Sequence, residues 1–322
     1  MSVDIPNLKM GRKEWGLLLL LSALWGGSFF FFKILVRELP PFTVVLGRVG
    51  IAAALLNLVL LVGRDRVPGG IRLWGAFFVM GLLNNVIPFT LIVYGETRIS
   101  SGMASILNAM TPIFTVLAAH VFTSNEKLSS RKMAGVLCGF LGVMILIGPN
   151  SILQGDKGNL IGEASCLLAA LSYAIAGIFG RRFRGIPPMK VATGQITAST
   201  AMLIPFALIV DRPWTLSPPS TDVWLALFGI ALLSTAFAYM IYFRILATSG
   251  ATNIALVTFL LPISALLLGT LFLNETISAQ ALAGMVMIGL GLAAIDGRLV
   301  TVLGRLGRLR RESSLLGTEP DY

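Results

Sequence analysis

The chain carries one pattern twice, and the second copy begins 147 positions after the first: Ala23-Leu24-Trp25, Pro40-Pro41 and Gly47 recur as Ala170-Leu171-Ser172, Pro187-Pro188 and Gly194. A later pattern recurs after 149 positions: Asn125-Glu126-Lys127-Leu128-Ser129, Ala134-Gly135 and Gly142 recur as Asn274-Glu275-Thr276-Ile277-Ser278, Ala283-Gly284 and Gly291. A drift of two residues is the size of a small loop insertion. The sequence therefore predicts two structural repeats, each about half of the chain.

The composition places these repeats in a membrane. Of the 322 residues, 56% are hydrophobic and 12% are charged, and the mean hydropathy is +0.85. So much apolar surface is not compatible with water, and a helix needs about 20 apolar residues to cross the hydrocarbon. The sequence predicts an all-α membrane protein with ten transmembrane helices, over about 15–36, 43–62, 72–94, 99–122, 132–148, 160–180, 189–210, 222–246, 252–272 and 279–296.

The distribution of basic residues gives the orientation. With a cytoplasmic N-terminus, 19 of the 25 Lys and Arg residues fall on the inside, which predicts a multi-pass protein of the cytoplasmic (inner) membrane with both termini in the cytoplasm. Five helices per repeat then make the second repeat inverted relative to the first. We expect a first repeat over 1–148, a second over 149–303 and a cytoplasmic tail over 304–322.

Inverted repeats that each span half of a membrane protein are typical of transporters, which hold their substrate near the bilayer midplane between the halves. Two other classes stay open at this point. A passive channel conducts without saturation, and a non-transporting receptor or scaffold uses its polar residues only to join helices.

Ionisable residues inside transmembrane helices are costly and are functional candidates by default. Arg48 lies about five residues inside the second stretch, and its repeat counterpart is Gln195. Arg48 either attracts a substrate carboxylate or extends to the outer interface, whereas for Lys33 the second interpretation is favoured.

Paired amides lie in the third stretch, where Asn84 and Asn85 precede Pro88. A proline inside a helix frees a backbone carbonyl, and the amides add donors and acceptors beside it. We expect both asparagines to contact substrate and Pro88 to act as a helix hinge. The alternative is hydrogen bonding between helices.

Two further prolines interrupt stretches that are related by the repeat. Asn108 and Thr111 precede Pro112, and Thr258 precedes Pro262. Bends near the midplane of related helices suit the wall of a cavity, so Asn108 and Thr111 are candidate binding residues and the prolines candidate hinges. The alternative is that the prolines only shape packing.

Three aromatic residues lie well inside their helices, away from the interfaces where aromatic belts form: Trp25, Tyr173 and Tyr239. We expect Trp25 and Tyr173 to stack with substrate and Tyr239 to offer a hydroxyl. Each of them alone is also typical of a packed core.

Other function classes lack their motifs. The sequence has no phosphate-binding glycine loop followed by Lys-Ser/Thr, no His-Glu-x-x-His and no nucleophile elbow, and its one histidine is His120. We therefore expect no enzyme, no cofactor, no metal and no nucleic-acid partner, but a small-molecule substrate and membrane lipid. The carboxylates Glu96, Glu163 and Glu275 fall near helix ends or in loops, which favours uncoupled or weakly coupled transport of neutral or zwitterionic substrates. The oligomeric state stays open.

The repeated five-helix pattern, the Trp after Ala-Leu, the Pro-Pro run into Gly47-Arg48 and the helices of Pro112 and Pro262 followed by Asn-Glu resemble the drug/metabolite transporter superfamily. Within it, about residues 15–296 look like EamA-type exporters, most of all the YddG-type amino-acid exporters. The resemblance implies a basket of helices around a central cavity, with the fifth helix of each repeat outside. It also implies an alternating-access exporter of amino acids, aromatic ones included, or of similar metabolites. Ala109 and Thr111 depart from the aromatic residues of that branch, and multidrug, nucleoside or sugar export in the same superfamily is the alternative.

Overall fold

The computed structural model describes residues 11–122, 128–153, 157–254 and 256–296, and every regular element within these ranges is a helix. The expected tail at 304–322 and the repeated Asn125-Glu126-Lys127 lie outside the described residues.

The first repeat forms five rods, of which the third and fourth are interrupted. These are α1 (Arg12–Leu35), α2 (Pro41–Val62), α3 (Ile71–Gly81) continued by the π-helix η1 (Leu82–Val86) and α4 (Ile87–Glu96), α5 (Ser101–Asn108) followed by α6 (Thr111–Phe122), and α7 (Ser130–Leu153).

The second repeat follows the same plan. Its elements are α8 (Lys157–Phe179) with η2 (Gly180–Phe183), α9 (Pro188–Phe206) with η3 (Ala207–Asp211), the short η4 (Pro213–Thr215), α10 (Thr221–Ala231) continued by η5 (Leu232–Phe237) and α11 (Ala238–Ile254), α12 (Val257–Leu273) and α13 (Ala279–Asp296). Eight rods are long and apolar enough to cross a membrane, and α12 and α13 are shorter apolar helices. The prediction of ten transmembrane helices in two repeats of five is confirmed.

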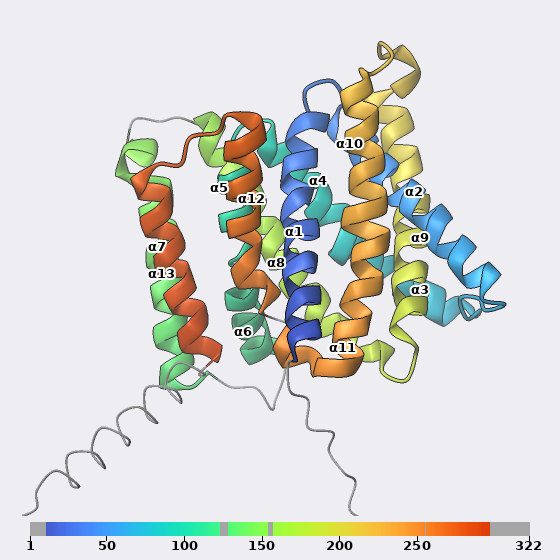
Figure 1. Cartoon of the computed structure of the whole chain (residues 1–322), viewed down its shortest axis with the longest axis horizontal. Helices are drawn as coiled ribbons and strands as arrows, with labels where there is room; N and C mark the ends of the chain where they lie inside the picture. Colours follow the sequence, from blue (N-terminus) through green and yellow to red (C-terminus); the bar gives the residue numbers. More distant parts are fainter. Residues whose placement is uncertain (1–10, 123–127, 154–156, 255, 297–322) are drawn as a thin grey trace, which may run out of the picture.

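The two repeats run in opposite directions through the bundle. In Figure 1, α1 begins and α13 ends at the lower end of the molecule, whereas α8 begins at the upper end. Neighbouring rods come from different repeats, because α1 packs on α12, α4 on α8 and α2 on α9. The interface between the repeats therefore passes through the centre of the bundle.

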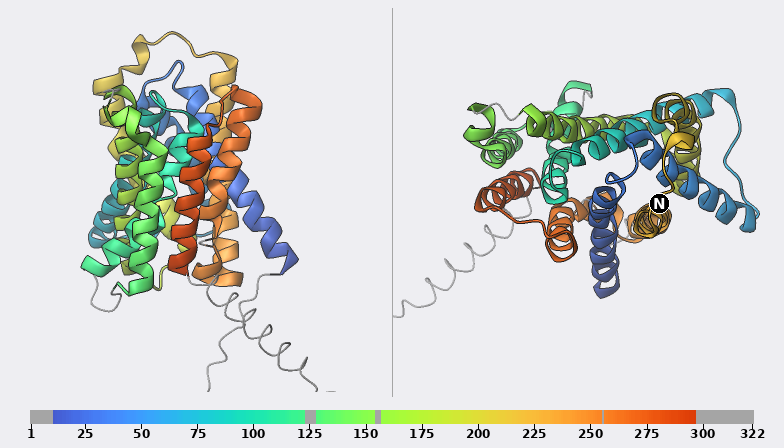
Figure 2. Two further views of the ribbon diagram at one scale, coloured as in Figure 1. Left: turned by 90° about the vertical axis from the view of Figure 1, so that its left-hand side faces the viewer. Right: turned by 90° about the horizontal axis from the view of Figure 1, so that it is seen from above.

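The fifth helices, α7 and α13, lie side by side at one edge of the bundle (Figures 1 and 2). Their contact is backbone against backbone. A Cβ added at Gly135 would lie 2.6 Å from the carbonyl oxygen of Gly291, and one added at Gly142 would lie 2.9 Å from that of Gly284. Small residues permit this close approach. The glycines common to the two repeats thus pair the fifth helices within one chain.

Candidate functional site

Two helix crossings related by the repeat form the frame of the site. At the first, a Cβ added at Gly47 of α2 would lie 2.8 Å from the side chain of Leu227 on α10. At the second, a Cβ added at Gly194 of α9 would lie 2.7 Å from the ring of Phe77 on α3. In each crossing the absent side chain lets a large apolar residue of the other repeat approach the backbone. The residue after each glycine is therefore held at the interface between the repeats.

Each crossing faces a π-helical segment. The segments η1 (Leu82–Val86) and η5 (Leu232–Phe237) occupy matching positions in the third rod of their repeats, and they contain Asn84-Asn85 and Ser234-Thr235 respectively. A π-helix widens one turn and is frequent at functional sites. The two widened turns bring four polar side chains to the repeat interface.

Arg48 is the cation at the first crossing. Its side chain is only 4% exposed, and its Nε donates to Oγ1 of Thr235 at 2.9 Å. Its guanidinium carbon lies 3.8 Å from the ring centroid of Phe89 and 5.0 Å from that of Phe32. The Arg48 side chain turns into the bundle and does not extend to the outer interface, whereas its attraction of a substrate carboxylate stays a prediction. Such aromatic faces stabilise a desolvated cation.

Gln195 takes the equivalent position at the second crossing. The Nδ2 of Asn84 donates to Oε1 of Gln195 at 3.3 Å, and the Asn84 side chain also forms a hydrogen bond with Tyr239. Tyr239 and Tyr173 lie close enough to Arg48 to interact with it electrostatically. Four of the predicted residues, Arg48, Asn84, Tyr173 and Tyr239, therefore belong to one group with Gln195. We call these five residues the central cluster.

Trp25 and Tyr173, both predicted to stack with substrate, belong to different aromatic pairs. The ring of Trp25 lies 5.5 Å from that of Tyr242, and the ring of Tyr173 lies 6.4 Å from that of Phe89. Trp25 packs with Leu18, Leu21 and Ile241 in a separate apolar cluster. Because Tyr242 follows Tyr239 by one turn of α11, Trp25 lies beside the central cluster and not in it.

Asn85 points away from its neighbour. It is fully buried, its Nδ2 donates to Oγ of Ser199 at 2.9 Å, and its Oδ1 has no partner among the described residues. The contact joins η1 to α9, which is the interhelical alternative that the sequence left open. Adjacent residues on a helix point about 100° apart, which explains the different roles.

The fourth rod breaks ahead of its proline, as expected of a hinge region. Helix α5 ends at Asn108, α6 begins at Thr111, and the Thr111 hydroxyl donates to the carbonyl oxygen of Asn108 at 2.8 Å. The Oδ1 of Asn108 is buried without a partner in the described structure. Pro262, by contrast, lies inside the continuous α12, and Pro88 follows η1. Motion at these prolines stays a prediction.

Two polar contacts tie α2 to α9 at opposite ends. The Nζ of Lys190, at the start of α9, lies 2.7 Å from Oδ1 of Asp65, and the backbone nitrogen of Thr43, in the first turn of α2, donates to Oδ2 of Asp211 at 2.6 Å. The contacts are equivalents under the repeat. The hydrogen bond from Lys190 lowers the pKa of Asp65 below its ordinary value.

Three groups were missed by reasoning from sequence. The rings of Phe32 and Phe89 pack against the guanidinium of Arg48. Nothing in the sequence distinguished these two residues from other apolar residues. Glu96 ends α4 as expected, yet it is fully buried. Lys33 is not extended toward an interface, because its Nζ donates to the carbonyl oxygens of Glu96 and Ile99 at 2.8 and 2.7 Å.

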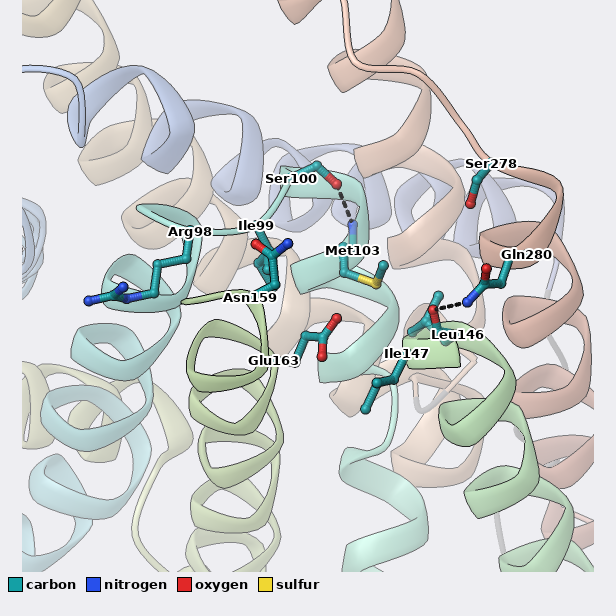
Figure 3. A pocket seen from close by; sticks show the side chains of 10 residues that line it. All are labelled: Arg98, Ile99, Ser100, Met103, Leu146, Ile147, Asn159, Glu163, Ser278 and Gln280. Atoms are coloured by element: carbon teal, nitrogen blue, oxygen red, sulfur yellow. Dashed lines mark hydrogen bonds between the residues drawn. The ribbon is translucent and has the colours of Figure 1, made fainter. Parts of the chain in front are cut away.

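A pocket of about 350 Å³ lies elsewhere, between the upper ends of α4, α5, α7, α8 and α13 (Figure 3). No residue of the central cluster lines it. The pocket and the central cluster are therefore separate features.

Comparison with known proteins supports the repeat and the fold. Residues 13–148 and 160–295 each match the model of the EamA-like transporter family. A Bacillus subtilis protein named uncharacterized transporter YoaV is 28% identical over 272 residues, which cover 84% of this chain and 92% of the relative. An Escherichia coli protein named probable amino-acid metabolite efflux pump is 26% identical over 291 residues, covering 88% and 94%.

Another Escherichia coli relative, the uncharacterized inner membrane transporter YedA, is 27% identical over 267 residues, which cover 82% of this chain and 84% of YedA. A solved crystal structure superposes with a TM-score of 0.60 over 88% of this chain and 95% of the other, at 18% identity, which shows a shared fold. Two family matches cover most of the sequence and coincide with the two five-helix repeats. The chain is a multi-pass membrane protein and belongs to the EamA-like transporter family of the drug/metabolite transporter superfamily.

Proposed function

We propose that this transporter exports amino acids, aromatic ones included, or similar small metabolites from the cytoplasm by alternating access of its two inverted repeats. The observation that carries the proposal is the single cation of the central cluster. Arg48 lies at the repeat interface with aromatic rings below it and amide and hydroxyl groups around it. A carboxylate binds a guanidinium by charge-assisted hydrogen bonds, and rings accept an apolar side chain.

The proposed contacts follow from the geometry. Arg48 binds the substrate carboxylate, while Asn84, Tyr173 and Tyr239 contact the remainder. Trp25, Asn108 and Thr111 stay in the proposal as binding residues outside the central cluster, and Asn85, also predicted to bind, is proposed to support the site through its contact with Ser199. Pro88, Pro112 and Pro262 are the proposed hinges. The relative named as an amino-acid metabolite efflux pump supports this substrate class.

The proposed placement is the cytoplasmic membrane with both termini inside, supported by the 19 of 25 basic residues that fall on that side. Residues 1–148 and 149–303 are the moving halves, and 304–322 is a cytoplasmic tail. Among the described residues of the central cluster, Arg48 is the only one that carries a charge at neutral pH. The substrate site itself therefore offers no acid for a coupling ion, which supports uncoupled or weakly coupled transport.

The test is exchange in proteoliposomes containing the purified protein. We expect saturable uptake of labelled amino acids that rises when unlabelled amino acid is preloaded. The amines that lack only the carboxylate should compete poorly. Uptake without saturation would indicate a channel, no flux of any solute a scaffold, and flux of nucleosides, sugars or drugs alone another substrate class. Each of these results would overturn the proposal.

A further inference from the structure

A third helix crossing, formed by two glycines, lies near the upper end of the bundle, away from the central cluster. A Cβ added at Gly95 of α4 would lie 2.9 Å from the carbonyl oxygen of Gly162 on α8. A Cβ added at Gly162 would lie 3.1 Å from the carbonyl oxygen of Gly95. A glutamate follows each glycine. Glu96 is fully buried and Glu163 is 4% exposed. The close approach of the two backbones therefore carries two carboxyl groups into the interior.

The charged neighbours of Glu96 come from three other elements. Lys33 on α1 and Glu275, in the turn before α13, both act on Glu96 electrostatically. Cys166, one turn beyond Glu163 on α8, lies against Gly95 and is influenced by both Glu96 and Glu163. This part of the molecule thus contains three carboxyl groups, Lys33 and, in the lining of the pocket of Figure 3, Arg98, whose guanidinium lies over the ring of Tyr94.

Glu275 is the carboxyl group that the fold surrounds with hydrogen-bond donors. Its oxygens accept hydrogen bonds from the backbone nitrogen and the hydroxyl of Ser101, both at 2.8 Å, and from the backbone nitrogen of Gly102 at 3.2 Å. These donors belong to the first turn of α5, where the partial positive charge of a helix favours an anion. Glu275 therefore has the hydrogen bonds that stabilise a carboxylate.

Glu96 is the opposite case. Neither of its carboxyl oxygens has a hydrogen-bond partner among the described residues, although both are buried. The ammonium group of Lys33 donates to the backbone carbonyl of Glu96 and not to its carboxyl group. An ionised carboxylate without hydrogen bonds is very costly in an apolar interior, so a proton on Glu96 is the favourable state.

The pocket of Figure 3 borders this region. Glu163 lines the pocket with Asn159, Ser100 and Gln280, and Figure 3 shows its carboxyl group directed into the space between α8 and α5. Glu163 lines this polar pocket and, like Glu96, acts electrostatically on Cys166. It is placed to pass a proton between the pocket and Glu96.

We propose that Glu96 binds and releases a proton during the transport cycle, with Glu163 as the relay to the pocket. The proposal rests on the proposed export function and specifies its weak coupling. In one state of the cycle Glu96 takes up a proton from the pocket through Glu163, and in the other state it releases this proton to the cytoplasmic side as the amino acid moves outward. The net charge of this region then changes by one without involving the substrate cation site at Arg48.

The first test needs no substrate. Infrared spectra of the reconstituted protein at neutral pH should contain the carbonyl band of a protonated carboxylic acid. The matched control is Glu38→Gln, because Glu38 is an exposed carboxylate that accepts a hydrogen bond from the backbone nitrogen of Ser220. We expect Glu96→Gln to lose the band and Glu38→Gln to keep it. An unchanged band in Glu96→Gln would overturn the proposal. Glu96→Asp should shift the band. If Glu96→Gln does not fold, Glu96→Asp serves as the test variant instead.

The second test measures flux. The wild type and Glu38→Gln should exchange amino acids without a gradient and be stimulated by a pH gradient. Glu96→Gln should keep the exchange and lose the stimulation. Stimulation that persists in Glu96→Gln, or is missing from the wild type, would overturn the proposal. If no variant moves any amino acid, the export function fails, while the infrared band still decides whether Glu96 holds a proton.

Discussion

The two crossings at the centre of the molecule share a frame and differ in charge. Gly47 and Gly194 each accept an apolar residue of the other repeat, and the next residue contacts the π-helical turn opposite. At one crossing that residue is Arg48, with Thr235 as its partner, and at the other it is Gln195, with Asn84. Duplication supplies a symmetric frame, whereas a site for an asymmetric substrate needs its two ends to differ. The charge difference gives the site its polarity.

The largest effect is expected when this difference is removed. Arg48→Gln makes the crossings alike, and the protein should fold because glutamine already occupies the equivalent position. A hydrogen bond to a charged group contributes about 1.5–3 kcal/mol, so exchange of amino acids should fall roughly ten- to a hundredfold. Flux at subsaturating substrate in proteoliposomes measures this, with the exposed Arg37→Gln as control. Equal loss for substrates with and without a carboxylate would contradict the assigned role.

The frame itself can be tested by adding one methyl group to each crossing. Gly194→Ala meets the ring of Phe77, which is fully buried and stacked on Phe183, whereas Gly47→Ala meets the more adaptable side chain of Leu227. Overpacking typically costs about 1–3 kcal/mol, and we expect Gly194→Ala to lie at the upper end and Gly47→Ala at the lower. Thermal unfolding in detergent compares them. The reverse order would show that the crossings are not packed as described.

Neighbouring asparagines in η1 separate contact with the substrate from support of the helices. Asn84→Leu removes a member of the central cluster, so KM for an amino acid should rise severalfold with little change in Tm. Asn85→Leu removes the buried contact with Ser199 and should lower Tm and maximal flux at unchanged KM. KM and maximal flux from transport kinetics, and Tm from melting curves of the same preparations, distinguish the two roles. A raised KM in Asn85→Leu would return Asn85 to direct contact with substrate.

The smallest effect is expected at the exposed tie between α2 and α9. Because Lys190 lowers the pKa of Asp65, the tie stabilises the folded state above the ordinary carboxylate range, and this contribution is lost as the pH falls through the lowered pKa. Exposed ion pairs are weak, so Lys190→Met should change Tm only slightly at neutral pH. Its Tm should decline less than that of the wild type on acidification. If Tm falls with pH in parallel for the wild type and Lys190→Met, the contact between Lys190 and Asp65 contributes nothing to stability.

The sequence predicted the helices because twenty-residue apolar runs have few alternatives in a membrane. Four of its candidate binding residues, Arg48, Asn84, Tyr173 and Tyr239, lie together in the central cluster, and they were candidates because polar residues inside such runs are rare. It could not predict which of the two adjacent asparagines joins the central cluster and which contacts Ser199. The reason is that a π-helix changes the direction of the side chains without a clear sequence signal. It placed Glu96 near a helix end correctly, but burial there depends on Gly95 meeting Gly162, a contact between distant parts of the chain.

The ties of α2 to α9 have one more consequence. Both are formed in this structure, Lys190 with Asp65 at one end and Thr43 with Asp211 at the other. If the repeats rock so that one end of the bundle opens at a time, a different one of these two contacts is broken in each open state. The first is an ion pair between the exposed Asp65 and the partly exposed Lys190, which dissolved salt screens, while the second uses partly buried hydrogen bonds that salt hardly affects. Ionic strength should therefore tilt the balance between the two open states toward the one that parts Lys190 from Asp65.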